Sequence, residues 1–79
     1  MALARCDEHK PDNSGDDYHT YALPVGYPQT AVTCDVADCH NPARLWLTKD
    51  ERQRFLAGER VFSVAGGTRL RVADNLFPN

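Results

Sequence analysis

The sequence predicts a small α+β domain, with an antiparallel sheet and one short helix. Three observations predict this class. Apolar and polar residues alternate in two stretches of the second half, which is the period of a half-buried strand. A helix-capping pattern, Thr48-x-x-Glu51, opens a run of good helix formers between them. Three cysteines and a histidine fall in two short pairs, a spacing typical of metal sites that staple small cores.

The size of the chain favours a single domain that needs such a staple. With 79 residues, its core supplies about 3–5 kcal/mol, and chains of this length usually carry disulfides or a structural metal. Three cysteines are an odd number, which does not suit a closed set of disulfides. We therefore interpret residues 1–79 as one zinc-binding domain.

In the first half, the sequence predicts mostly irregular chain and one strand. Residues 10–17 are polar and acidic, so they predict a mobile loop. Residues 18–29 combine aromatic residues with two prolines, which favours extended or turning chain because proline disfavours helix at the residue before it. Residues 29–34 contain β-branched side chains and predict a strand that leads into Cys34.

A returning strand and a helix are predicted next. Residues 42–47 place Ala43, Leu45 and Leu47 on one face and polar or aromatic side chains on the other. The capping pattern then predicts a helix over residues 49–57, with an apolar stripe and a left-handed glycine after it. The stripe and the glycine are Phe55, Leu56 and Gly58.

The last predicted element is a hairpin of residues 60–64 and 68–72. A three-residue loop with Gly67 in the left-handed conformation gives one apolar and one mostly polar face, so burial favours it over a two-residue loop. The apolar face then consists of Phe62, Val64, Leu70 and Val72. Residues 73–79 are predicted to form a tail, whose Leu76 and Phe77 either fold back on the core or bind a partner.

The metal site is predicted from the pairs Cys6-x2-His9 and Cys34-x4-Cys39. Structural zinc takes four nitrogen or sulfur ligands in a tetrahedron, and each short pair can present two of them from one turn. The 24 residues between His9 and Cys34 let the two turns face each other. The predicted zinc ligands are therefore Cys6, His9, Cys34 and Cys39.

Two other histidines are alternatives for the fourth ligand. His19 follows the acidic loop and could replace His9 if the first turn does not form. His40 is adjacent to Cys39, and neighbouring residues in a turn of this kind usually point apart. The short spacing from Cys6 favours His9 over both.

The segment from Cys34 to Ala43 resembles the Cys-x4-Cys-x2-Pro-Ala knuckles of small zinc-ribbon and treble-clef domains. The resemblance covers about ten residues and implies a zinc-binding turn between two strands. In those domains a second cysteine pair usually follows downstream, but no cysteine follows Cys39. The partner pair is therefore the upstream one, which departs from the standard treble clef.

The function that the sequence favours is a non-catalytic interaction module. The chain has no His-Glu-x-x-His and no Pro-Cys-x-x-Cys pattern, so a zinc hydrolase or a metal-handling protein is the weaker alternative. A protein partner is favoured, with nucleic acid as the second candidate. The candidate partner-binding residues are Trp46, Arg52, Arg69 and Arg71. Further aromatic anchors, if exposed, are Tyr21, Tyr27 and Phe77.

Charge and targeting signals bear on the partner and the location. Residues 1–40 carry a net charge of −5 and residues 41–79 carry +3, within an overall charge of −2. This balance gives no strong attraction to phosphate, although the basic second half leaves nucleic acid as an alternative. The chain shows neither the apolar core of a signal peptide nor a stretch long enough to cross a bilayer, so we expect a cytoplasmic protein that does not use a membrane.

Overall fold

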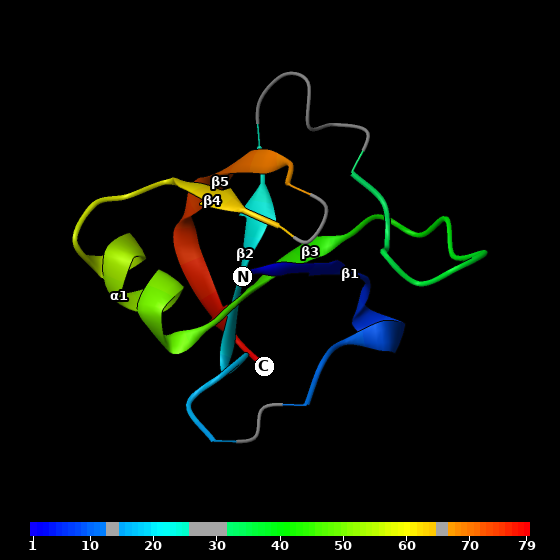
Figure 1. The fold of residues 1–79 in the computed structure, drawn as a ribbon, viewed down its shortest axis with the longest axis horizontal. Coiled ribbons are helices and arrows are strands. Elements are labelled where there is room, and N and C mark those ends of the chain that lie inside the picture. Colours follow the sequence, from blue (N-terminus) through cyan, green and yellow to red (C-terminus); the bar gives the residue numbers. More distant parts are fainter. Residues whose placement is uncertain (13–14, 26–31, 65–66) are drawn as a thin grey trace.

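The computed structural model describes residues 1–12, 15–25, 32–64 and 67–79. Its architecture is a curled antiparallel sheet with one short α-helix, which agrees with the predicted α+β class (Figure 1). The strands, the 3-10 helix η1 and the α-helix follow in the order β1 (Leu3–Arg5), η1 (Asp7–His9), β2 (Thr20–Pro24), β3 (Arg44–Leu47), α1 (Lys49–Leu56), β4 (Val61–Ser63) and β5 (Arg69–Pro78).

The five strands lie in the order β1-β3-β2-β5-β4, and each neighbouring pair is antiparallel. Four antiparallel steps separate β1 from β4, so these two edge strands run in the same direction. Ala2 and Val64 form a parallel bridge, and the Ala2 amide donates a hydrogen bond of 3.2 Å to the Ser63 carbonyl. The sheet therefore curls until its two edges meet at this point.

The core fills the inside of the curled sheet. The side chains that alternate inward include Ala22 from β2, Leu45 and Leu47 from β3, and Phe62 from β4. Helix α1 adds Phe55, whose ring lies 6.5 Å from that of Phe62. Of the face predicted for residues 42–47, Leu45 and Leu47 join the core, whereas Ala43 precedes β3 and lines a pocket instead. Other members of the core are Ala2, Val64, Leu70 and Val72.

The predicted hairpin register is confirmed. Phe62 pairs with Leu70, and Ser63 pairs with Arg69, so three residues connect the paired positions 64 and 68. Gly67 has a φ of 86°, the left-handed conformation that a glycine adopts without strain. Residues 65–66 lie outside the described part of the chain.

Helix α1 begins with the predicted capping box. The Glu51 carboxylate accepts hydrogen bonds from the Thr48 amide at 3.0 Å and the Thr48 hydroxyl at 2.9 Å. The Glu51 amide donates to the Thr48 hydroxyl in return, at 3.4 Å. Only half of the predicted apolar stripe is correct, because Phe55 is buried whereas Leu56 is 75% exposed. Successive helical residues point about 100° apart, so one short helix on this sheet buries only one of them.

Several predicted boundaries differ from the structure. The sequence does not predict β1 and β2 as strands, yet both pair with β3. Of the predicted strand 29–34, residues 29–31 lie outside the described chain, and Thr33 forms only an isolated bridge with Pro42. Residues 73–78 are not a tail, because they continue β5 and pair with β2. The described residues of the predicted loop 10–17 contain no helix or strand.

Candidate metal centre

The four predicted ligands come from two places that the fold brings together. Strand β1 ends directly before Cys6, and η1 turns the chain back so that His9 faces it. The second pair lies in the turn that precedes β3, where the Cys34 amide donates to the Asn41 carbonyl at 2.9 Å. The Asp35 amide donates to the Ala4 carbonyl at 2.8 Å, which attaches this turn to β1. The two ligand pairs are thereby held next to each other, on the side of the molecule away from α1 (Figure 1).

The ligand atoms form a compact group. All four lie within 4.8 Å of one another. The Cys6 Sγ is 3.2 Å from the His9 Nδ1 and 3.6 Å from the Cys39 Sγ, and the Cys34 Sγ is 3.5 Å from the same nitrogen. A zinc tetrahedron with bonds of about 2.0–2.3 Å has edges of about 3.5–3.8 Å. The spacing of this group is therefore close to that of a tetrahedral metal site.

Backbone amides point at the sulfur atoms in a repeated pattern. The sulfurs of Cys6, Cys34 and Cys39 each accept a hydrogen bond from the amide two residues further on. These amides belong to Glu8, Val36 and Asn41. Such bonds stabilise negative charge on sulfur.

The environment lowers the pKa of two of the three thiols and raises that of the third. Burial raises the pKa of Cys6 and of Cys34, but hydrogen bonds to each sulfur outweigh it, so both pKa values lie below the usual thiol value. The Asn41 amide lowers the pKa of Cys39. Burial and the sulfurs of Cys6 and Cys34 raise it by more, so the pKa of Cys39 lies above the usual thiol value. Three neighbouring thiolates repel one another. A bound cation removes that repulsion, so the group is suited to a metal.

The structure also distinguishes the three histidines. His9 belongs to the group of ligand atoms, whereas His19 and His40 do not. The His19 ring bonds to the Gly15 carbonyl instead, and His40 is exposed. His9 is therefore the histidine that the fold places beside the three cysteines.

One of the four predicted partner-binding residues is buried. Trp46 is 1% exposed, so it is not available as an anchor. Its indole nitrogen donates to the Arg5 carbonyl at 2.9 Å, and its ring packs 4.7 Å from that of Tyr21. Arg69 and Arg71 are exposed on β5, and Arg52 is partly exposed on α1. Tyr27 lies outside the described residues.

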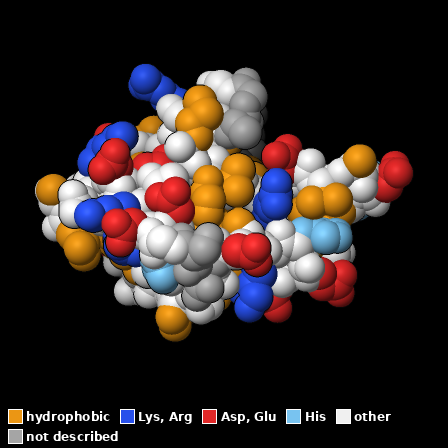
Figure 2. Space-filling model, turned by 60° about the horizontal axis from the view of Figure 1, so that its bottom comes forward, with side chains coloured by type: hydrophobic (Ala, Val, Ile, Leu, Met, Phe, Trp, Pro, Cys, Tyr) orange, Lys and Arg blue, Asp and Glu red, His pale blue; other side chains and the backbone are white. Residues whose placement is uncertain are grey.

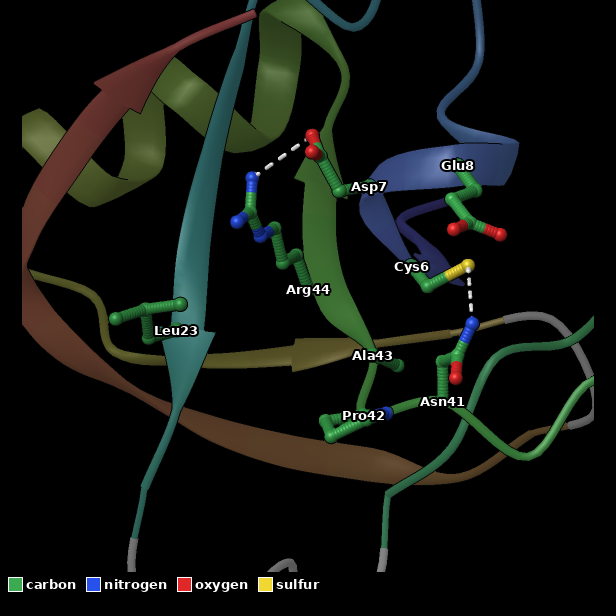
Figure 3. A pocket seen from close by; sticks show the side chains of 8 residues that line it. All are labelled: Cys6, Asp7, Glu8, Leu23, Asn41, Pro42, Ala43 and Arg44. Atoms are coloured by element: carbon green, nitrogen blue, oxygen red, sulfur yellow. Dashed lines mark hydrogen bonds and ion pairs between the residues drawn. The ribbon is translucent and has the colours of Figure 1, made fainter.

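An open pocket beside the ligands was not predicted from the sequence. Its volume is about 440 Å³, and it lies between η1, the end of β2 and the start of β3 (Figure 3). The residues that line it are Cys6, Asp7, Glu8, Leu23, Asn41, Pro42, Ala43 and Arg44. Asn41 connects the pocket to the ligands, because its side-chain amide lies 3.9 Å from the Cys6 sulfur. No local sequence signal indicates the pocket, since its walls come from three separate segments.

Comparison with known proteins does not assign the chain to a family: no protein-family model, no curated protein and no solved structure matches it. In the part of the chain that the structure describes, no helix is both long and apolar enough to cross a membrane.

Proposed function

We propose that Cys6, His9, Cys34 and Cys39 bind one zinc ion that staples the domain. The observation that carries this proposal is the compact group of three sulfurs and one nitrogen from two distant segments. Buried thiols rarely gather in this way without a metal or a disulfide, and all three cysteines are free.

The donor set favours zinc over the other common metals. Calcium and magnesium prefer oxygen ligands, whereas thiolate and imidazole together suit zinc. Iron–sulfur clusters usually take four cysteines, and this chain has three. A set of three cysteines and one histidine is one of the standard structural zinc sites.

The proposed role of the metal is structural rather than catalytic. Four protein ligands complete the tetrahedron, while catalytic zinc keeps one position for water or substrate. The proposed function is therefore a non-catalytic, zinc-stabilised module that binds a protein partner in a reducing compartment such as the cytoplasm, where thiolates persist as ligands.

The surface supports a protein partner. Figure 2 shows an apolar patch in the middle of one face, bordered by both basic and acidic side chains. A mixed border of this kind is typical of protein interfaces, whereas nucleic acid requires a field of one sign.

Native mass spectrometry of the purified chain tests the metal. We expect the mass of the chain plus one zinc ion, and the mass of the bare chain after a chelator is added. A well-dispersed NMR spectrum from the bare chain in chelator would contradict the zinc staple.

Nucleic acid is the second candidate, because Arg69 and Arg71 are exposed next to each other on one face of β5. Neither forms an ion pair with another described residue. Binding of single-stranded oligonucleotides should then weaken steeply with salt. Loss of that binding when both arginines are changed to alanine would favour this candidate over a protein partner.

A further inference from the structure

We propose that the pocket beside the zinc ligands holds a lysine or arginine side chain from a basic segment of the partner protein. This inference rests on the proposed protein-binding function and names its surface and its partner chemistry. The pocket of about 440 Å³ falls within the range of volumes that bind small ligands, and it is open to solvent, so a side chain on a second protein can enter it.

One wall of the pocket is apolar. Leu23 is 41% exposed near the end of β2, and Pro42 and Ala43 contribute further apolar lining from the chain before β3 (Figure 3). Proline has no amide hydrogen, so this wall offers little to a polar ligand. The methylene stem of a lysine or an arginine can pack on such a wall while its charged end stays in a polar region.

The opposite wall is acidic. Asp7 and Glu8 both line it, and the Asp7 carboxylate is paired with the Arg44 guanidinium at 3.1 Å. Arg44 also lies 4.7 Å over the ring of Tyr21, so its charge is already engaged. Glu8 forms no ion pair with any described residue, and its carboxylate is exposed. One negative charge at the rim is therefore without a counterion from the chain.

The neighbouring ligands add negative charge on the same side. The Cys6 sulfur lies at the pocket, and a zinc ion with three thiolates and a neutral histidine carries a net charge of −1. Asn41 uses its amide nitrogen on that sulfur, which leaves its carbonyl oxygen as an acceptor. The Arg44 charge offsets that of Asp7, so Glu8 and the zinc-bound sulfur leave the polar side of the pocket with a net negative charge, which favours a cation and disfavours a phosphate.

An NMR titration of the ¹⁵N-labelled chain with two matched peptides tests the inference. The peptides are Ac-Ala-Leu-Arg-Leu-Ala-NH₂ and the same sequence with glutamate in place of arginine. We expect the arginine peptide to shift the amide signals of residues 6–8, 23 and 41–44, and the glutamate peptide to leave them unchanged. Equal shifts from both peptides, shifts confined to other surfaces, or no shifts would overturn the inference. So would a single-stranded oligonucleotide that shifts these same signals.

Two pocket variants and one control make the test specific. Glu8→Gln should weaken binding of the arginine peptide about fivefold, the upper range for an exposed charge pair. Leu23→Ala should also weaken it, since it removes the apolar wall. Glu59→Gln changes the same charge beyond α1, away from the ligands, and should have no effect. Equal loss in all three variants would overturn the inference.

Native mass spectrometry of the same sample separates the two proposals. If the chain carries zinc but the peptide causes no shifts, only the proposal for the pocket is contradicted. If the chain carries no zinc and the arginine peptide still causes the expected shifts, only the proposal of a zinc staple is contradicted.

Discussion

The two sides of this molecule are held together in different ways. On the side of α1, Leu47, Phe55 and Phe62 pack in a core that several strands share. On the opposite side, the turn around Cys34 and Cys39 is joined to the other described residues by an isolated bridge and a few backbone hydrogen bonds. Cys34 is buried and Cys39 is half-buried, and no large apolar side chain between them is buried. Apolar burial therefore organises one side, whereas the other brings together four side chains that are suited to hold a metal.

The largest expected effect is that of removing a ligand from this second side. Cys34→Ser should abolish zinc binding and unfold the domain. The free energy of binding structural zinc is about 10–16 kcal/mol in zinc-finger peptides. A core this small contributes about 3–5 kcal/mol to the stability of the fold, which is less. The measurement is the dispersion of the ¹H–¹⁵N spectrum with and without zinc. His40→Ala, beside Cys39 but outside the ligand group, is the control and should keep both zinc and dispersion. A folded, zinc-free Cys34→Ser protein would show that the core side stands alone.

The next effect comes from the apolar side. Phe62→Ala removes one of the largest fully buried side chains and should lower the free energy of unfolding by about 3–5 kcal/mol. Urea unfolding with zinc in excess measures this loss. Leu56→Ala removes an exposed side chain and should change the stability by less than about 0.5 kcal/mol. Similar losses in both variants would mean that the core does not lie where the structure places it.

The histidines provide a smaller and sharper test of the ligand side. His9→Ala should lower zinc affinity by more than the ~10–100-fold that loss of an outer-shell partner costs, because it removes a direct ligand. His19→Ala is the matched control and should leave the affinity unchanged, since His19 bonds to the Gly15 carbonyl. Competition with a chromogenic chelator gives both affinities. A larger loss for His19→Ala would identify a different fourth ligand.

The smallest expected effect concerns the start of α1. Thr48→Ala removes the hydroxyl that bonds to the Glu51 amide and carboxylate, and should lower the free energy of unfolding by about 1 kcal/mol. Thermal unfolding with zinc present measures the change. Thr68→Ala, at an exposed position of the hairpin, should have an effect below about 0.5 kcal/mol. Equal effects would mean that the capping box contributes nothing beyond the loss of a threonine.

Structural features that depend on residues close together in the sequence could be predicted from the sequence. The capping box involves residues three apart, and the hairpin register follows from the alternation of apolar side chains on both sides of one short loop. Strands β1 and β2 could not be predicted in this way. Each is short, and β2 ends at a proline. Their extended conformation is decided by pairing with β3, which lies far away in the sequence.

The same division holds for the candidate site. The sequence by itself determined which residues can act as ligands, because short spacings place two donors in one turn whatever the rest of the fold does. Only the tertiary structure decided that His9 joins the cysteines, that Trp46 is buried by Tyr21, and that a pocket opens beside Cys6. Each of these depends on contacts between segments far apart in the chain. Such contacts form only when the sheet curls, and no local pattern of residue types encodes them.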